Sequence, residues 1–376
     1  METPLYIHIP FCKRKCFYCD FYSEAYDQKL SSAYIDVIIN QIEKSPRNFS
    51  TIYIGGGTPS ALEPKLLKRL LKALRSKLSC AGLEFTVEAN PESLDDCRVK
   101  VLLDSGVNRL SIGVQSFDDR KLKKLGRLHN AEKARGSVCL AAKRGFSNIS
   151  IDLMFGVWGE APEDWKSEVA EAAELPVSHI SCYSLTYEKE TPLFKALLNK
   201  SIRPIEDDQA SAMYETAIGL LAVRGFKQYE ISNFAKREGF KCRHNINYWE
   251  NNSYIGLGAS AVSYIDGVRA KNVPNIQEYI RRYEAGASLI ESSERLSPVR
   301  RAKETAAIKI RTRDGIDFRW FREKTGYDLQ ALERKTLLEL AGKGLIKYKR
   351  EGASLTGIAL KHRGLLFCDT VSAALL

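Results

Sequence analysis

Apolar positions change their spacing repeatedly over the first 225 residues of the chain. Short apolar runs predict strands at residues 5–10, 51–54, 83–89, 109–114, 148–154 and 179–185. Between them, apolar residues recur every three or four positions, which predicts helices at 31–43, 64–78, 94–105, 163–174 and 207–223, with two helical pieces between 118 and 144. Strands that alternate with helices of about ten or more residues imply right-handed crossovers and a parallel sheet. The pattern therefore predicts an α/β fold, a partial (β/α)6 barrel.

A different pattern begins near residue 295. Helices are predicted at 296–311, 319–324 and 329–342, followed by a basic hairpin made of 345–352 and 353–356. Helices followed by a basic hairpin are typical of a small winged-helix-like α+β domain. We therefore divide the chain into a core barrel (1–225), a barrel-completing segment (226–294) and a C-terminal domain (295–376).

The composition indicates the cellular compartment of the protein but does not select a function. The chain has 376 residues, 44% of them hydrophobic, and nine cysteines without paired, regular spacing. It shows neither a basic-then-apolar leader nor an apolar run near 18 residues. We therefore expect a protein without a membrane span in a reducing compartment, and the cytoplasm fits. The formal charge of +11 is spread along the whole chain and is attributed mainly to solvated helix faces.

Three cysteines lie within eight residues near the start, at Cys12, Cys16 and Cys19. A loop this short can direct its thiols at one metal centre, but it supplies only three of the four thiolates of a closed zinc or [4Fe-4S] site. The residues alone leave three interpretations open: a metal centre with a free position, a zinc loop that lacks a ligand, and incidental thiols.

Further polar residues follow the predicted strands at their carboxyl ends, where barrel proteins carry their sites. Gly55 to Thr58 follow the second strand, where glycine lets the backbone come close to a ligand. Glu88 ends the third strand and is suited to an amine or a ribose, and Gln115 after the fourth can both donate and accept. Arg127 can pair with a carboxylate through its planar fork, and Asp152 is a carboxylate within an otherwise apolar strand.

The Cys-x3-Cys-x2-Cys spacing, with an aromatic residue before the last cysteine, resembles the signature of the radical S-adenosylmethionine (SAM) superfamily. The resemblance implies that the three cysteines hold three irons of a [4Fe-4S] cluster and that SAM chelates the fourth. By motif it also implies a set of SAM-contacting residues: Tyr6, Tyr18, Gly56, Gly57, Thr58, Glu88, Gln115, Arg127 and Asp152.

The order of these motifs resembles, over nearly the full chain, the HemN/HemW branch of the superfamily. That branch contains oxygen-independent coproporphyrinogen III dehydrogenases and haem chaperones, and its members carry a C-terminal domain of the kind predicted here. Two features depart from the dehydrogenases: only eleven residues precede Cys12, and Asp20 and Phe21 follow Cys19 where those enzymes have a fourth cysteine. Both favour the chaperones.

A third feature is the His-Asn-x-x-Tyr-Trp element, which the resemblance associates with haem. His244 can ligate iron, Arg243 can pair with a propionate, and Tyr248 and Trp249 can lie against the porphyrin. Without the resemblance, the same residues fit a polar loop whose histidine caps a helix and whose Tyr-Trp pair packs in the core.

Two positions depart from the family pattern. Trp158 replaces a proline after the fifth strand, so we expect the loop there to be shaped differently. Val262 stands where relatives often carry histidine, which removes a possible iron ligand and places more weight on His244.

The sequence therefore predicts a haem chaperone that carries a SAM-ligated [4Fe-4S] cluster and passes haem to an acceptor protein, which the sequence does not identify. The alternative is a coproporphyrinogen III dehydrogenase, which would cleave SAM and require an electron donor. An RNA-modifying SAM enzyme is a distant third, since only the C-terminal domain suggests nucleic acid as a partner.

Overall fold

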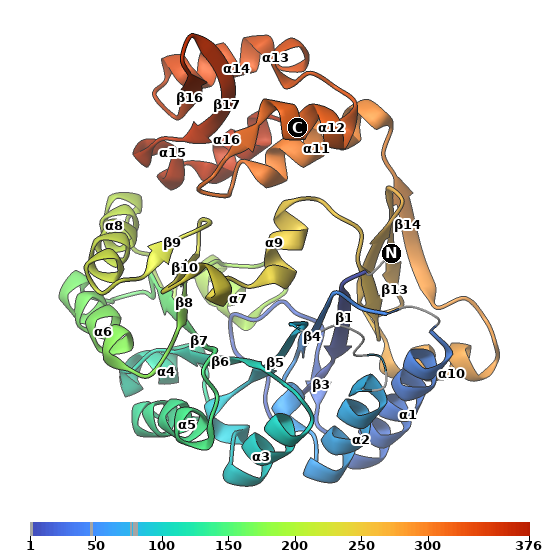
Figure 1. Cartoon of the computed structure of the whole chain (residues 1–376). Coiled ribbons are helices and arrows are strands. Elements are labelled where there is room, and N and C mark those ends of the chain that lie inside the picture. Colours follow the sequence, from blue (N-terminus) through green and yellow to red (C-terminus); the bar gives the residue numbers. More distant parts are fainter. Residues whose placement is uncertain (1–2, 46–47, 76, 78–81) are drawn as a thin grey trace.

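The computed structural model describes residues 3–45, 48–75, 77 and 82–376. Its main sheet contains the six predicted strands in chain order and all parallel. They are β1 (Leu5–Ile9), β4 (Thr51–Gly56), β5 (Glu84–Ala89), β6 (Arg109–Gln115), β7 (Ile149–Phe155) and β8 (His179–Ser184). Figure 1 shows these strands as an arc with helices along its outer side. The predicted α/β partial barrel is confirmed.

The outer helices fall where the apolar spacing placed them. They are α1 (Gln28–Lys44), α2 (Pro64–Arg75), α3 (Asp96–Asp104), α4 (Asp119–Leu125), α5 (Ala131–Arg144), α6 (Pro162–Glu174) and α8 (Asp207–Val223). In α2 the buried residues are five leucines at one-, three- and four-residue steps, which form one face toward the sheet. α2 spans Pro64–Arg75, and positions 76 and 78 of the predicted helix 64–78 lie outside the described residues.

The sheet extends beyond the six predicted strands at both edges. β11 (Ile255–Leu257) pairs in parallel with β1, while β10 (Asn233–Ala235) pairs antiparallel with β8 and with β9 (Lys227–Gln228). These three strands have only two or three residues each, too few to produce a periodic pattern. The six-strand prediction is therefore incomplete.

Residues around the cysteine loop and beyond β8 form further short elements. β2 (Phe11–Cys12) pairs with β3 (Glu24–Ala25), so the two ends of the cysteine loop are joined. α7 (Pro192–Leu198) and α9 (Arg243–Trp249) follow β8, and α9 packs against β4. A second sheet contains β12 (Val262–Ile265), β13 (Val268–Asn272) and β14 (Ile290–Arg295), with α10 (Ile276–Glu284) inserted before β14.

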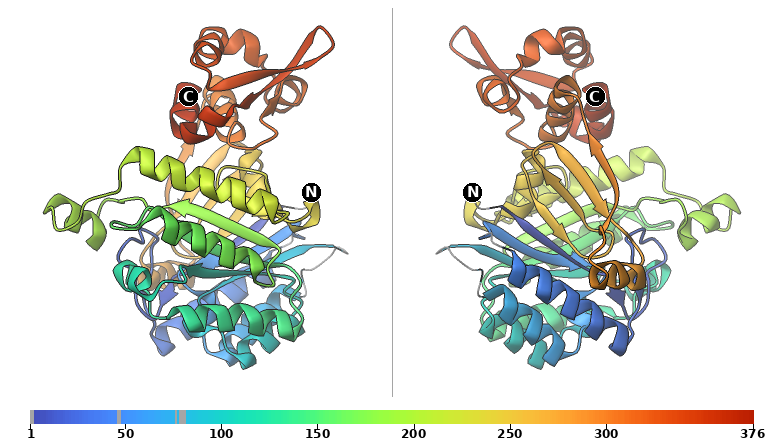
Figure 2. Two further views of the ribbon diagram at one scale, coloured as in Figure 1. Left: turned by 90° about the vertical axis from the view of Figure 1, so that its left-hand side faces the viewer. Right: turned by 90° about the vertical axis from the view of Figure 1, so that its right-hand side faces the viewer.

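The C-terminal part is a small α+β unit, seen above the barrel in both views of Figure 2. Its antiparallel sheet has the order β15 (Ile316–Asp317), β17 (Ser354–Leu360), β16 (Ile346–Glu351). Its helices are α11 (Pro298–Lys309), α12 (Phe318–Thr325), α13 (Leu329–Leu332), α14 (Arg334–Gly342), α15 (His362–Leu366) and α16 (Cys368–Ala374). The predicted basic hairpin is confirmed as β16 and β17.

One predicted helix, 329–342, is in fact two. Glu333 leaves the helical conformation with φ −122° and ψ 29°, which separates α13 from α14. Its buried carboxylate is 2.7 Å from Lys303 Nζ and accepts a hydrogen bond from Thr336. The helix break thus coincides with a tertiary contact of Glu333.

The C-terminal unit contacts the barrel through α9 and the residues after it. Asn251 donates to Thr305 Oγ1 on α11 at 3.0 Å, and the Arg311 guanidinium lies 5.6 Å from the ring centre of Trp249. The predicted segment boundaries at residues 225 and 295 stay predictions. No helix among the described residues has the length and apolarity to cross a membrane.

Candidate cofactor site at the carboxyl ends of the strands

A cavity of about 540 Å³ opens at the carboxyl ends of the parallel strands. All three cysteines of the N-terminal loop line it, together with eight of the nine residues predicted to contact SAM: Tyr18, Gly56, Gly57, Thr58, Glu88, Gln115, Arg127 and Asp152. These residues come from positions 12 to 152 of the chain. The structure therefore brings the predicted cluster residues and nearly all the predicted SAM residues to one place.

The glycines at the end of β4, and Gly57 directly after it, are required by close contacts. A Cβ atom on Gly55 would lie 2.7 Å from Glu88 Oε2, and one on Gly57 would lie 2.8 Å from the Phe11 carbonyl oxygen. Gly56 has φ +109°, in the region that favours glycine. The backbone N–H of Gly57 donates to the Ile9 carbonyl at 2.9 Å. Without side chains, this loop can lie directly against the start of the cysteine loop.

Glu88 is held by two donors at the floor of the cavity. The Tyr53 hydroxyl donates to Oε1 at 2.7 Å, and the Gly56 N–H donates to Oε2 at 3.2 Å. Burial raises the pKa of Glu88 to about 7 and nearby Asp152 adds to the rise, while both hydrogen bonds oppose it. A cationic or hydroxyl-bearing ligand placed here would favour the ionised carboxylate.

Asp152 and Gln115 lie on the same wall. Burial raises the pKa of Asp152, against a hydrogen bond from Ser181 and the charges of Arg109 and Arg127. Gln115 has φ 65°, at the point where the pairing of β6 with β7 shifts register. A non-glycine residue in this region is strained, and such strain is concentrated at sites that bind or react.

Arg127 joins parts of the site that are distant in sequence. Its Nη1 lies 3.3 Å from Cys16 Sγ, and its Nη2 donates to Asn90 Oδ1 at 2.6 Å and to the Gly113 carbonyl at 2.8 Å. Asn90 in turn donates to Thr58 Oγ1 at 2.9 Å, and that hydroxyl lies 3.5 Å from Cys12 Sγ. A continuous polar chain therefore runs from one cluster cysteine to another.

The donor chemistry of the cavity fits a [4Fe-4S] cluster and SAM. Among the described residues, no three His, Cys, Asp or Glu side chains are close enough to hold one metal ion. A cluster in which each cysteine binds a different iron does not require that proximity. Burial raises the pKa of the Cys12 and Cys19 thiols, so they would release protons on binding iron. Arg127 Nε is buried without a hydrogen-bond partner, a free donor for an anionic group.

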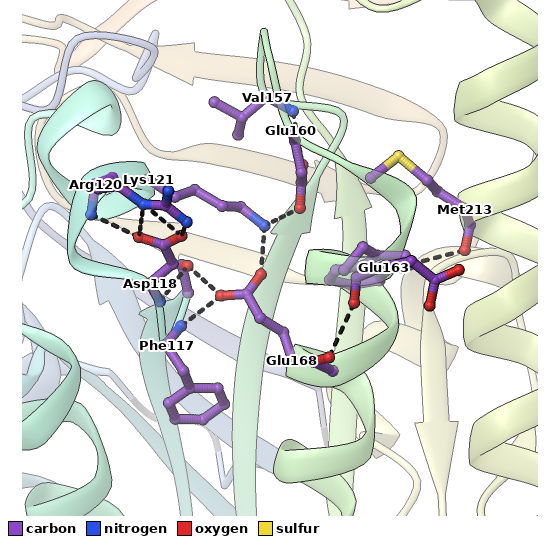
Figure 3. A network of polar contacts seen from close by, with 12 residues as sticks. Phe117, Asp118, Arg120, Lys121, Val157, Glu160, Glu163, Glu168 and Met213 are labelled. Atoms are coloured by element: carbon purple, nitrogen blue, oxygen red, sulfur yellow. Dashed lines mark hydrogen bonds and ion pairs between the residues drawn. The ribbon is translucent and has the colours of Figure 1, made fainter.

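A buried ion cluster fixes the loop after β7, where Trp158 departs from the family pattern. Lys121 Nζ on α4 contacts Glu160 Oε1 and lies 2.6 Å from Glu168 Oε2 on α6. Figure 3 shows how this lysine joins the two carboxylates. Glu160 also accepts from the Val157 N–H at 3.0 Å, and Glu168 from the Phe117 N–H at 2.6 Å. These ion pairs and hydrogen bonds therefore connect the loop after β6 with the loop after β7.

Trp158 itself lies against α4. Lys124 Nζ donates to the Trp158 carbonyl oxygen at 2.7 Å and lies 5.7 Å from the centre of its ring. Trp158 packs on the small apolar cluster that contains Leu125 and Met154, and Met154 lines the cavity. The substituted residue therefore supports the wall of the site.

Tyr6 is not among the residues that line the cavity, and its contact with SAM stays a prediction. Its hydroxyl is hydrogen-bonded with His8 Nδ1 at 3.0 Å, and its ring stacks on Tyr53 at 6.2 Å. Tyr6 occupies the barrel interior, below the residues that face the cavity.

The predicted haem element is not part of the cavity. His244 is 1% exposed in α9, and its Nδ1 and Nε2 are hydrogen-bonded with Thr51 Oγ1 at 2.7 Å and the Tyr248 hydroxyl at 2.8 Å. Arg243 donates to the Gly82 carbonyl, and Trp249 lies under Arg311. In this conformation neither ring nitrogen of His244 is free, so iron ligation stays a prediction that requires one of these two hydrogen bonds to break. The alternative interpretation expected a polar loop whose histidine caps a helix, whereas His244 lies inside the helix α9 and is hydrogen-bonded with Thr51 and Tyr248.

Sequence reasoning missed three residues of the site. Asn90 completes the chain between the cysteines, Tyr53 holds Glu88, and Tyr183 at the end of β8 lines the cavity with 39% of its surface exposed. Asn90 and Tyr183 each lie at a strand end, which is the signal that could have found them. Tyr53 lies inside β4 and gives no such signal.

Comparison with known proteins agrees with this geometry. The profile of the radical SAM superfamily matches residues 6–171, and that of the HemN C-terminal domain matches residues 296–360. The solved structure of HemN, coproporphyrinogen III oxidase from Escherichia coli, superimposes with a TM-score of 0.83 at 21% identity, covering 100% of this chain and 90% of that one. At this identity, the match shows the shared fold.

Curated relatives are closer in sequence. Heme chaperone HemW of Lactococcus lactis is 37% identical over 353 residues, covering 93% of this chain and 92% of its own length. That of Bacillus subtilis is 36% identical over 378 residues, covering 99% and 98%, and that of Escherichia coli is 39% identical over 273 residues, covering 70% and 71%. With the radical SAM signature, the cavity at the strand ends and near full-length similarity to the Lactococcus lactis and Bacillus subtilis proteins, the chain belongs to the HemW family of the radical SAM superfamily.

Proposed function

We propose that this protein is a haem chaperone that carries a [4Fe-4S] cluster with bound SAM and transfers haem to an acceptor protein. The observation that carries the proposal is the similarity to proteins named heme chaperone HemW, at 36–37% identity over more than nine-tenths of both chains. The absence of a helix long and apolar enough to span a membrane among the described residues is compatible with a cytoplasmic location, which is part of the proposal.

In the proposal, Cys12, Cys16 and Cys19 ligate three irons of the cluster and SAM occupies the remainder of the cavity. Three thiols on one wall, the free Nε donor of Arg127 and the carboxylates of Glu88 and Asp152 support this assignment. Glu88 is suited to the cationic or hydroxylated parts of SAM, and Arg127 to its carboxylate. Bound cluster and SAM would supply one-electron chemistry if a reductant were present.

Haem is the cargo in this scheme. The relatives named heme chaperone HemW support haem binding. The predicted haem contacts stay His244, Arg243, Tyr248 and Trp249. For His244 to ligate iron, one ring nitrogen must give up its hydrogen bond, either Nδ1 with Thr51 Oγ1 at 2.7 Å or Nε2 with the Tyr248 hydroxyl at 2.8 Å. Haem binding at α9 therefore predicts a local opening of that helix.

The test is a haem titration beside an anaerobic assay for coproporphyrinogen III decarboxylation, both on the same cluster-reconstituted protein. We expect saturable haem absorption changes and no decarboxylation. Decarboxylation with SAM and a reductant, in the absence of haem binding, would instead establish the dehydrogenase.

The predicted ligand is tested with His244→Phe, which keeps an aromatic ring of similar size but has no nitrogen for iron. We expect weaker haem binding and a changed haem spectrum with unchanged cluster iron. An unchanged spectrum would place the iron ligand elsewhere.

A further inference from the structure

α9 lies at the amino-terminal ends of β4 and β5 in the partial barrel, whereas the cavity lies at the carboxyl ends of the strands. The carboxylate of Glu84, at the first residue of β5, accepts the backbone N–H groups of Arg243 at 2.9 Å and His244 at 3.0 Å. Glu84 and Glu88 are four residues apart on the same strand, so their side chains lie on the same face. The helix that carries the predicted haem element and the floor of the cofactor cavity therefore share one strand face.

His244 is the side chain that α9 directs into the barrel interior. Its ring stacks on Tyr53, with centroids 5.1 Å apart and planes 29° from parallel. Burial lowers the pKa of His244 to about 3, so the ring is neutral across the physiological range. Its contribution in this conformation is therefore packing and hydrogen bonding.

Tyr53 connects His244 to Glu88, which lines the cavity. It is two residues beyond Thr51 on β4, and its hydroxyl donates to Glu88 Oε1 at 2.7 Å. Its ring forms a triangle with the rings of His244, 5.1 Å away, and Tyr6, 6.2 Å away, and those two rings are themselves 6.5 Å apart. Among the described residues, neither Tyr53 nor His244 lines the cavity. Tyr53 is connected to the cavity directly through its hydrogen bond to Glu88.

We propose that Tyr53 and His244 are positioning residues for SAM: α9, through the ring stack of His244 on Tyr53, holds the Glu88 carboxylate in the orientation that binds the cofactor. The inference rests on the proposed function, which places SAM against Glu88. It gives the buried His-Asn-x-x-Tyr-Trp element a role on the cofactor side of the molecule.

The test measures SAM affinity by anaerobic calorimetry on full-length, cluster-reconstituted variants with wild-type iron content. Tyr53→Phe removes the hydroxyl and keeps the ring, and should weaken SAM binding roughly tenfold, as expected for one lost hydrogen bond to a carboxylate. The matched control is Tyr214→Phe. It also removes a buried tyrosine hydroxyl, one that donates to the Ile231 carbonyl oxygen at 2.7 Å and belongs to a residue that does not line the cavity. The control should bind SAM like the wild type.

Two substitutions of His244 separate stacking from its nitrogens. His244→Phe keeps an aromatic ring beside Tyr53 and should leave SAM affinity within about twofold of wild type, since no hydrogen bond to Glu88 is lost. His244→Ala removes the ring and should weaken SAM binding by about the same factor as Tyr53→Phe. An equal loss of SAM affinity in His244→Phe and His244→Ala would show that the stacking of the His244 ring on Tyr53 does not support SAM binding.

A pH profile distinguishes positioning from general damage to the pocket. The Tyr53 hydroxyl favours ionised Glu88, so without it the pH midpoint of SAM binding should move upward. The other titratable or charged groups that face Glu88 stay in place in Tyr53→Phe: Asp152, Arg109, Tyr6, Tyr183 and Tyr248. A merely loosened pocket would lose affinity without moving the midpoint.

Glu88→Gln separates failure of this inference from failure of the proposed function. Wild-type SAM affinity in Glu88→Gln would show that SAM is not bound at Glu88, which overturns the SAM site itself. Weak binding in Glu88→Gln, together with wild-type affinity and an unmoved pH midpoint in Tyr53→Phe, would overturn only the positioning role.

Discussion

At the scale of single residues, Arg127 shows how one side chain organises the site. Its guanidinium contacts Cys16 Sγ, Asn90 Oδ1 and the Gly113 carbonyl, and so connects the cysteine loop to the ends of β5 and β6. A lysine could not reproduce these contacts, because it offers a point charge in place of a planar fork. The geometry of the cysteine loop therefore depends on a residue more than a hundred positions away.

The first prediction concerns the cluster ligands. Cys16→Ala should lose most of the iron incorporated by anaerobic reconstitution, because only Cys12, Cys16 and Cys19 line the cavity among the described cysteines. Iron per chain is the measurement. Cys97→Ala, at an exposed cysteine on α3, is the control and should retain wild-type iron. Full iron retention by Cys16→Ala would refute the ligand assignment.

The second prediction concerns Glu88 and pH. In the cluster-free, SAM-free protein, burial raises the pKa of Glu88 from its ordinary value of 4.5 to about 7, so the folded chain binds more protons than the unfolded chain between these values. Its contribution to stability is therefore present below about pH 4.5 and is lost as the pH rises through about 7. Denaturant unfolding of Glu88→Gln across this range should show a smaller decline in stability than wild type. Identical pH slopes would count against the shifted pKa.

At the scale of elements, the loops around the cavity are held by buried charge. Lys121, Glu160 and Glu168 are each less than 10% exposed and come from α4, the loop after β7 and α6. Such a cluster specifies one arrangement of its elements, because separating any member leaves a buried charge without a partner. The loop with the unusual Trp158 thus depends on tertiary ion pairs for its shape.

The third prediction follows from this cluster. Lys121→Met should lower the free energy of unfolding by about 3–5 kcal/mol, since it leaves two buried carboxylates without their cation. Lys123→Met, two residues away on the exposed side of α4, should change it by less than about 0.5 kcal/mol. Urea denaturation of both variants tests the difference, and similar losses in the two would mean that the buried cluster contributes little.

At the scale of the whole molecule, α9 lies between the barrel and the C-terminal unit. Glu84 of the barrel caps its first turn, while Arg311 covers Trp249 from the other side. Lys309 on α11 also lies 3.2 Å from Glu250, immediately after the helix. The stability of this short helix should therefore depend on both parts.

The fourth prediction tests that dependence. Arg311→Ala should increase hydrogen exchange of the amides in α9 severalfold, because it removes the cation that packs on Trp249, and should leave exchange in α2 unchanged. Arg319→Ala removes an exposed pair with Glu323 on α12 and should have no effect on α9. Mass spectrometry of exchanged peptides measures both, and unchanged exchange in α9 of Arg311→Ala would show that the helix is held by the barrel alone.

The sequence by itself determined the elements that have strong local patterns. The leucines on one face of α2 and the alternating apolar residues Leu110, Ile112 and Val114 of β6 can be recognised without tertiary contacts, because burial imposes a fixed period on each type of element. Strand order then followed from the handedness of crossovers, and the convergence of Glu88, Gln115 and Asp152 followed from the strand order. The three cysteines could be recognised as candidate cluster ligands because they lie within eight residues of one another in the sequence.

Only the tertiary structure decided what depends on contacts between distant segments. The two- and three-residue strands β9, β10 and β11 exist because neighbouring strands offer unpaired backbone groups, which no local pattern records. At the break between α13 and α14, Glu333 pairs with Lys303, thirty positions away, and His244 is buried in contact with Thr51, Tyr53 and Glu84. A histidine in a polar stretch reads as a free ligand from sequence, since its partners lie about 160 to 193 residues earlier in the chain and meet it only when the barrel closes.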